Sequence, residues 1–401
     1  MELQTHLRET FAGVDAAGVD AAVSVAPYSL VTRRAGKAGD GRYTLSFGDA
    51  TPAAGPDVPA WVPQCAGVVV DADDGHRVVG FCAPRSLEVT LAPEQDADAE
   101  AALAAALGDP GDKAWYPYAE GFRVLAYRWN GALRLSTSKV VDAYGARYFR
   151  GSPSFGAQFD AAAAAAGLDV GRLVDGRCYA FVVQSPDTPM VCPAASPTLL
   201  HVATVDLATL TPLPDDDVGA PRPAWTPVGA SWAALALRLA TPSVDPGFPG
   251  FLVAGPPVPG GFGLHAKVMH PGYNAARDLV GSDRDLARRM MEVCLNAPQR
   301  AAMIRAAPHL KPTLFAVDER VHAAVCAVLN AYVAYNVRRE RKQLPQPVYE
   351  TIKALHHRVY LARAGANGGK RTPIAYGDVD TFVRGLSPAM VGALCRASAK
   401  M

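Results

Sequence analysis

The chain has 401 residues, of which half are hydrophobic, so two or three domains with sizeable cores are expected and global disorder is excluded. The formal net charge of +1 hides a division, because from Ala266 onward there are 21 basic residues against 10 acidic ones, whereas the preceding part has 18 against 28. No run reaches the ~20 consecutive apolar residues that a membrane-spanning helix needs, and the N-terminus lacks the basic and apolar stretches of a secretory signal.

The seven cysteines are scattered along the chain, and none forms a CxxC pair or a ligand-spaced set with histidine. We therefore expect small buried hydrophobic side chains in a reducing, cytoplasmic compartment and no metal site. A basic C-terminal part suits a polyanion such as RNA, although the two oppositely charged parts could also simply attract each other.

The first two-thirds of the sequence predicts mainly strands. Residues 42–47 read as a strand, and residues 67–71 and 77–81 as a hairpin around a glycine-containing turn. Helices are predicted at 94–107 and 154–167, and further strands at 122–127, 132–136 and 178–184. The proline-rich segment 186–228 is expected to be irregular, and strands follow at 251–253 and 264–269.

After Tyr273 the apolar residues recur every three or four positions, which predicts helices at 283–306, 314–343 and 346–364. A basic loop, 365–371, precedes a last helix that begins at Ser387 and Pro388. Strands first and helices last indicate an α+β fold, with one domain at 1–275 and a basic, all-helical domain at 276–401.

Four segments, in this order and spacing, resemble the phage-type RNA ligases and their relatives in large DNA viruses. They are 64–71 with 77–81 (QCAGVVVD and RVVGF), 118–124 with 133–139 (YAEGFRV and LRLSTSK), 178–186 (CYAFVVQSP), and 263–273 (GLHAKVMHPGY). The second resembles the KxDG nucleophile motif with its downstream strand, and the fourth resembles the KxK strand that holds nucleotide phosphates. With the helical tail included, the resemblance spans roughly residues 40–400.

The resemblance implies a nucleotidyltransferase fold of the ATP-grasp-like ligase kind, with antiparallel sheets and helices and an all-helical C-terminal domain. It implies ATP and Mg²⁺ as cofactors if the chain is active: adenylation of the protein, transfer of AMP to a 5′-phosphate, and attack by a 3′-hydroxyl. The nucleotide is expected in one cleft between two sheets, lined by Tyr118, Glu120, Gly121, Arg123, Ser136, Gln184, His265 and Lys267.

Five positions depart from the family pattern. Tyr118 stands where the nucleophilic lysine is expected, and a phenol is a poor substitute for an amine that forms a phosphoramidate. Gln184 replaces the strand carboxylate and His265 the first lysine of the KxK motif. Ala66 replaces the hairpin arginine, and Pro249 with Gly250 the usual acidic-Gly pair. Lys139, at the end of the neighbouring strand, is the candidate replacement nucleophile.

Two explanations stay open for these departures: the motif alignment is displaced by a few residues, or the reaction has been lost and the fold kept for binding. The leading hypothesis is an RNA-ligase-like nucleotidyltransferase that binds ATP and RNA ends. Its rival is a non-catalytic nucleotide- or RNA-binding protein, of a virus or virion, that retains the ligase fold. A third is a structural protein in which the four segments are coincidence.

The basic run Arg338, Arg339, Arg341 and Lys342 is predicted to end a long helix. Cations at that end complement the helix dipole, so a solvated helix end competes there with contact to the RNA backbone. No membrane partner is expected, and the oligomeric state is left open.

Overall fold

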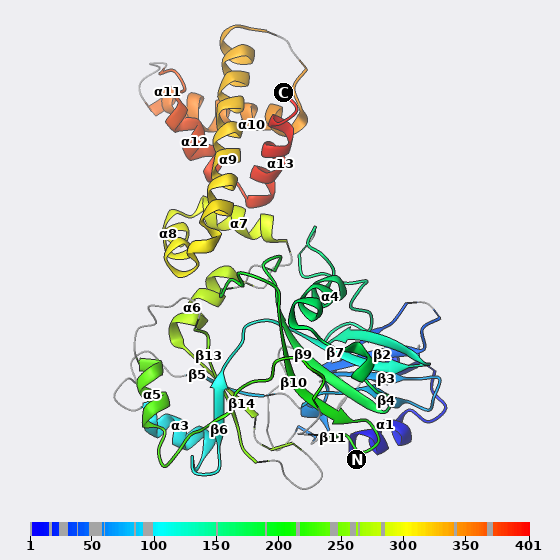
Figure 1. Ribbon diagram of the computed structural model, residues 1–401. Coiled ribbons are helices and arrows are strands. Elements are labelled where there is room, and N and C mark those ends of the chain that lie inside the picture. Colours follow the sequence, from blue (N-terminus) through cyan, green and yellow to red (C-terminus); the bar gives the residue numbers. More distant parts are fainter. Residues whose placement is uncertain are drawn as a thin grey trace. The chain divides into compact units, whose positions relative to one another are not determined.

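The computed structural model describes residues 2–15, 18–23, 31–37, 39–47, 58–59, 61–83, 86–90, 99–149, 151–188, 191–213, 217–240, 248–256, 262–263, 265–281, 285–340, 343–366 and 372–401 (Figure 1). The chain divides into two compact units, Met1–Arg277 and Asp278–Met401. Strands make up the sheets of the first unit, and the second is helical. The predicted α+β class, with largely antiparallel sheets and a helical C-terminal part, is confirmed.

The first sheet is antiparallel in the order β1-β2-β3-β4, with β1 at Val31–Ala35, β2 at Arg42–Phe47, β3 at Ala66–Asp71 and β4 at Arg77–Gly80. The predicted hairpin is confirmed, because β3 and β4 pair on either side of the turn that contains Gly75. Helices α1 (Glu2–Thr10) and α2 (Gly18–Val23) precede the sheet. Leu3, Leu7 and Phe11 of the N-terminal segment are fully buried in its core.

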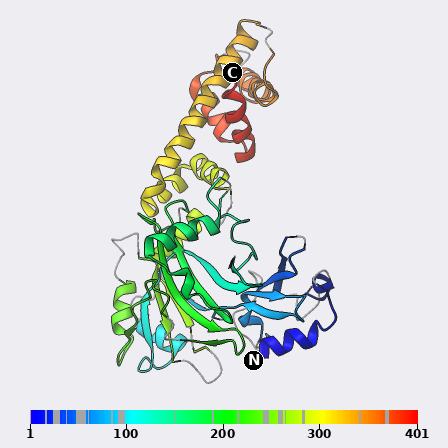
Figure 2. The ribbon, with the colours of Figure 1, turned by 45° about the vertical axis from the view of Figure 1, so that its right-hand side comes forward.

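The second sheet has the order β11-β10-β9-β7-β8, with β7 at Phe122–Trp129, β8 at Ala132–Thr137, β9 at Arg177–Gln184, β10 at Thr198–Asp206 and β11 at Thr211–Pro212. Strand β9, in the middle of this sheet, is buried on both faces, and Cys178–Phe181 forms a continuous buried run. Leu125 and Tyr127 of β7 pack with the first sheet, whereas the alternate residues Val124 and Ala126 pack with the opposite core. The two sheets lie side by side in both views (Figures 1 and 2).

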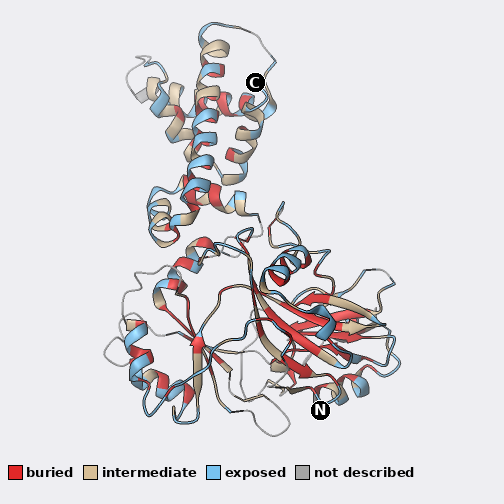
Figure 3. Cartoon of the chain, in the orientation of Figure 1, coloured by how far each residue is buried: buried red, intermediate tan, exposed pale blue. Residues whose placement is uncertain are grey.

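Helix α4 (Phe155–Ala166) covers the second face of this sheet. The Ser154 side chain accepts a hydrogen bond from the amide of Ala157, and Gly167 ends the helix in a left-handed conformation. These caps explain why a run made mostly of alanine begins and ends where the sequence predicted. In Figure 3 the sheet strands are mostly buried, whereas α4 turns an exposed face outward.

The third sheet has the order β12-β6-β13-β14-β5. Its strands are β5 at Leu87–Thr90, β6 at Ala114–Pro117, β12 at Thr226–Pro227, β13 at Gly250–Ala254 and β14 at His265–Met269. Only the β14–β5 pair is parallel in this sheet of the described chain. Helices α3 (Ala99–Leu107) and α5 (Ala233–Ala240) pack on one face, to which Ala266 and Val268 contribute. Helix α6 (Pro271–Val280) follows β14.

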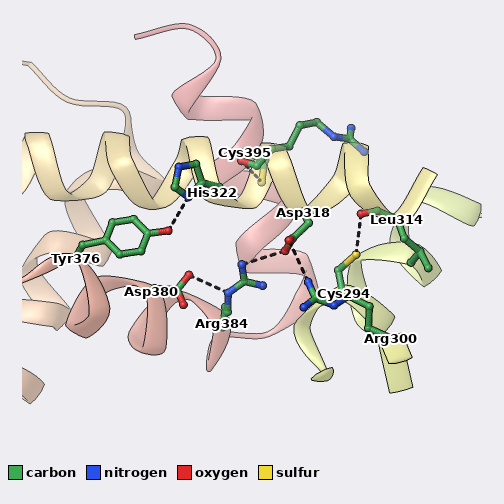
Figure 4. Close-up of polar contacts among 10 residues, drawn as sticks. Cys294, Arg300, Leu314, Asp318, His322, Tyr376, Asp380, Arg384 and Cys395 are labelled. Carbon is green, nitrogen blue, oxygen red and sulfur yellow. Dashed lines mark hydrogen bonds and ion pairs between the residues drawn. The ribbon is translucent and has the colours of Figure 1, made fainter. Parts of the chain in front are cut away.

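The helical unit is built around the long helix α9 (Lys311–Tyr332). It also contains α7 (Leu286–Leu295), α8 (Ala297–Ala306), α10 (Gln346–Leu355), α11 (Ala362–Ala366), α12 (Tyr376–Arg384) and α13 (Pro388–Ser398). π-Helical turns at Val333–Val337 and His356–Leu361 extend α9 and α10. Asp318 of α9 accepts hydrogen bonds from Arg300 and Arg384, both at 3.0 Å, and thereby links α8 and α12 to α9 (Figure 4).

Several predicted boundaries were wrong, and each has a local cause. The segment expected to be irregular, 186–228, contains β10, whose apolar and β-branched residues were outweighed in the prediction by the prolines around them. The helix predicted at 283–306 is broken at Asn296, which caps α8. The helix predicted to reach residue 343 ends after Val337, because Arg339 has a positive φ of 61°. Residues 94–98 and 367–371 lie outside the described residues.

Among the helices within the described ranges, none is both long enough and apolar enough to cross a bilayer.

Candidate functional site

The register of the second sheet brings three predicted site residues to the same end of its strands. Phe122, the first residue of β7, pairs with Val183 near the end of β9, and Val124 pairs with Thr137 at the end of β8. The residues just before β7, at the end of β9, and just after β8 therefore lie at the same end of the sheet. These are Glu120, Gln184 and Lys139.

Glu120 has an almost buried carboxylate, with 9% of the residue exposed. Its Oε2 accepts a hydrogen bond from the amide of Cys192 at 2.6 Å, and its Oε1 accepts from the amide of Val191 at 3.4 Å. The Tyr273 hydroxyl of α6 donates to Oε1 at 2.7 Å. Burial, followed by the negative charge of Glu120, raises the pKa of Tyr273, which therefore stays a donor. The carboxylate thus joins three distant segments of the chain.

Gln184 and Gly121 lie beside Glu120, and these three residues form one corner of the candidate site. The Gln184 amide donates to the carbonyl oxygen of Glu120 at 2.9 Å, and its carbonyl accepts from the Thr198 hydroxyl at 2.9 Å. Gly121 approaches β9 so closely that a Cβ atom there would lie 2.5 Å from the Val183 carbonyl oxygen. Only glycine fits this approach without a shift of the backbone.

Tyr118 lies where the chain crosses from the third sheet to the second. It follows β6 directly, and its amide donates to the Gly250 carbonyl at 2.8 Å. Lys267 lies on the neighbouring strand β14, on the face opposite to the buried Ala266 and Val268. The Lys267 ammonium is 5.2 Å from the centre of the Tyr118 ring, which is within the range of a cation–π contact.

Burial and nearby charges shift the pKa values of Tyr118 and His265. Burial raises the pKa of Tyr118, the negative charge of Glu120 raises it further, and Arg123 opposes both. Burial lowers the pKa of His265, and Arg123 lowers it further, so this side chain is neutral at pH 7. His265 therefore does not supply the positive charge of the lysine that it replaces. Lys267 and Arg123 are the cations that face this region from the described parts of β14 and β7.

Ser136 and Lys139 have different surroundings. Strand alternation places Ser136 on the face of the sheet that carries Arg123, since Ser136 pairs with Leu125. Ser136 is fully buried, near the Tyr127 hydroxyl. Lys139 is exposed to solvent, and its amide donates to the Thr137 hydroxyl at 3.3 Å. An amine nucleophile is usually activated by removal from water, and Lys139 lacks that feature.

The sequence analysis overlooked two residues at this corner. Tyr273 closes the fourth motif segment, but no role was assigned to it, although its place at the end of that segment was a usable signal. Glu88 of β5 is the register partner of Lys267 and raises the pKa of Tyr118. Because strand β5 was not predicted, the sequence offered no signal for this neighbour.

The oxygen atoms of Glu120 and Gln184 are poor ligands for a metal ion. The carboxylate of Glu120 already accepts three hydrogen bonds, and the side-chain carbonyl of Gln184 already accepts one. In the part of the chain that the structure describes, no three His, Cys, Asp or Glu side chains are grouped to hold a metal ion. The side chains of Glu120 and Gln184 therefore do not fit Mg²⁺.

The predicted RNA contacts belong to the helical unit. Arg338 and Arg339 are exposed just after the π-helical turn Val333–Val337. Arg341 and Lys342 lie outside the described residues. Tyr335 and Tyr349 meet edge to face beside this segment, with ring centres 5.8 Å apart, and 36% of Tyr349 is exposed. Arg339 also lowers the pKa of His356, after burial and the neighbouring His357.

No family model matches the sequence, and no curated protein matches it. Among solved structures, an archaeal ATP-dependent RNA ligase is similar at 15% identity, over 75% of this chain and 72% of that one, with a TM-score of 0.42. A putative ATP-dependent DNA ligase from Aquifex aeolicus is similar at 11% identity, over 85% and 87% of the two chains, with a TM-score of 0.42. A Naegleria gruberi RNA ligase variant with ATP and Mn is similar at 12% identity, over 40% and 51%, with a TM-score of 0.28.

Proposed function

We propose that this chain is an RNA-ligase-like nucleotidyltransferase that binds ATP and RNA ends but is degenerate at the nucleophile. The observation that carries the proposal is the contact between Lys267 of β14 and Tyr118, which stands at the position of the missing lysine. This contact joins the second and fourth motif segments, as the resemblance requires. Nucleotide phosphates would be held by Lys267 and Arg123, two cations that border the corner.

Loss of the covalent step follows from the chemistry of Tyr118. A nucleophile must be partly deprotonated to attack the α-phosphate, whereas the raised pKa of Tyr118 keeps its phenol protonated. Gln184 and Glu120 form hydrogen bonds within the protein, so neither side chain is available to bind a metal ion. What supports binding is the pair of cations, and what argues against adenylation is the phenol.

An active enzyme that uses Lys139 is the second candidate. Lys139 follows β8 at the same end of the sheet as Glu120. A movement of this strand end would bring the Lys139 amine toward the nucleotide. Its exposure to solvent is the argument against this candidate.

One labelling experiment separates these candidates. The protein is incubated with radiolabelled ATP or GTP and magnesium, and acid-stable label is sought after denaturing electrophoresis. We expect no label, together with a nucleotide-dependent rise in melting temperature. Label that survives Tyr118→Phe and disappears in Lys139→Ala would establish the active enzyme instead. Absence of any thermal shift with either nucleotide would contradict nucleotide binding altogether.

We also propose that RNA ends contact the surface formed by Arg338, Arg339, Tyr335 and Tyr349. Single-stranded nucleic acids are bound by cations that pair with phosphates and by aromatic rings on which bases stack. The net charge of +11 from Ala266 onward favours this partner. A titration of RNA affinity against salt tests the proposal, and a slope near zero would exclude backbone contact.

A further inference from the structure

Helix α9 carries a thiol and an imidazole one turn apart. Cys326 and His322 are separated by four residues, which places them on the same face of the helix. The Cys326 sulfur lies 3.7 Å from Nε2 of His322, within hydrogen-bonding reach for sulfur. Cys326 is partly exposed and His322 is exposed, so small molecules in solvent can reach the pair.

The other nitrogen of the imidazole is held by a second helix. Nδ1 of His322 lies 2.6 Å from the hydroxyl of Tyr376, the first residue of α12 (Figure 4). Helix α12 packs against α9, and the ion pair between Arg384 of α12 and Asp318 of α9 holds the two helices together. A nucleophile, a base within reach of it, and a third group that orients the base form the arrangement that activates cysteine.

We propose that Cys326, activated by His322 and oriented by Tyr376, is a reactive thiol of the helical unit that hydroperoxides oxidise to a sulfenic acid. Nε2 of His322 takes the thiol proton, and in the resulting ion pair the Tyr376 hydroxyl oxygen accepts a hydrogen bond from Nδ1. The thiolate attacks one peroxide oxygen and the O–O bond breaks. The departing oxygen takes the imidazolium proton, so a peroxide is reduced to water or an alcohol as the sulfur is oxidised.

The charges around the pair permit this ion pair. Asp318 of α9 and Asp380 of α12 would disfavour a thiolate, but both pair with the guanidinium of Arg384. Burial raises the pKa of Tyr376, and Asp380 raises it further, so the hydroxyl stays protonated beside the imidazole.

Cys395 is a matched control within the same unit. It is partly exposed like Cys326, but its sulfur is 3.5 Å from the Arg320 carbonyl oxygen, to which the thiol donates. Burial raises the pKa of the Cys395 thiol. Cys395 therefore reports how a thiol of this helical unit reacts without activation by an imidazole.

The full-length protein is treated with hydrogen peroxide in the presence of dimedone, and labelled cysteine peptides are quantified by mass spectrometry over time. We expect Cys326 to be labelled about tenfold faster than Cys395, since thiolate content sets the rate. His322→Gln should reduce the Cys326 rate to that of Cys395, and Tyr376→Phe should reduce it partly. Equal rates in the native protein, or an unchanged rate in His322→Gln, would overturn the proposal.

Alkylation by iodoacetamide at pH 7 gives a second measurement on the unaltered protein, which holds even if the His322 variant folds poorly. An activated Cys326 is alkylated faster than Cys395 in the same sample. Equal alkylation rates for the two thiols would sink the assignment.

Discussion

The ammonium of Lys267 lies 5.2 Å from the centre of the Tyr118 ring. Strand β14 of the third sheet thereby contacts the segment that leads from β6 to β7 of the second sheet. This contact joins two segments that the sequence marked separately, 118–124 and 263–273. A buried carboxylate, Glu120, follows Tyr118 by two residues and is held by Tyr273. The corner therefore combines the carboxylates of Glu120 and Glu88 with Lys267 and Arg123, whose charges suit phosphates.

Replacing Lys267 with methionine should weaken nucleotide binding roughly 10- to 100-fold, since a hydrogen bond to a charged group is worth about 1.5–3 kcal/mol. Lys267→Arg should retain most of the affinity. The measurement is the nucleotide-dependent shift in melting temperature. Lys353→Met, at an exposed position of α10, is the control and should leave the shift unchanged. An undiminished shift in Lys267→Met would place the nucleotide elsewhere.

Glu120→Ala should reduce the free energy of unfolding by about 2–4 kcal/mol, because the Tyr273 hydroxyl and the Cys192 amide lose their acceptor. Tyr273→Phe should cost less, about 1–2 kcal/mol. The two effects should be non-additive in a double-mutant cycle measured by urea unfolding. Strict additivity would show that the two side chains do not interact.

Gly121→Ala should destabilise the protein by about 1–3 kcal/mol, because the added Cβ would lie 2.5 Å from the Val183 carbonyl oxygen. Gly377→Ala in α12 is the matched control, since a Cβ there meets nothing within 4 Å. In that helix the change should stabilise by about 0.5–1 kcal/mol. The free energy of unfolding of each variant checks both signs, and equal effects would contradict the close approach at Gly121.

His265 should make the first unit sensitive to acid. Its pKa in the folded state is lowered from 6.5 by burial, so below pH 6.5 the unfolded chain takes up the proton first. The contribution to stability is complete above pH 6.5 and is lost as the pH falls. His265→Gln should therefore flatten the dependence of urea-unfolding stability between pH 7.5 and 5. An unchanged pH dependence in His265→Gln would contradict this role of His265.

Arg338→Ala combined with Arg339→Ala should reduce the magnitude of the salt slope of RNA binding by roughly 1.4, because each phosphate contact with a single strand contributes about 0.7. Affinity should fall similarly for unrelated RNA sequences, since phosphate contacts carry no sequence information. Arg305→Ala, at an exposed position of α8, controls for loss of a single charge. An unchanged slope in the double variant would move the RNA surface away from these arginines.

The sequence by itself determined the features that depend on neighbours along the chain. The β-branched runs on either side of a glycine-containing turn placed the β3–β4 hairpin, and the strand-like run Arg42–Phe47 placed β2. The caps Ser154 and Gly167 set α4. The charge division and the four motif segments were also visible there. Strand β5 and the partners of Glu120 were not, because no local pattern specifies what a side chain meets across the fold.

Only the tertiary structure decided what the motif residues do. The Glu120 carboxylate binds Tyr273, 153 residues further along, and the amide of Cys192, 72 residues away. Such contacts form when sheets pack and water is expelled, because a buried carboxylate must then find donors within the protein. The same burial keeps Tyr118 protonated and His265 neutral, which no spacing of residues along the chain could have shown.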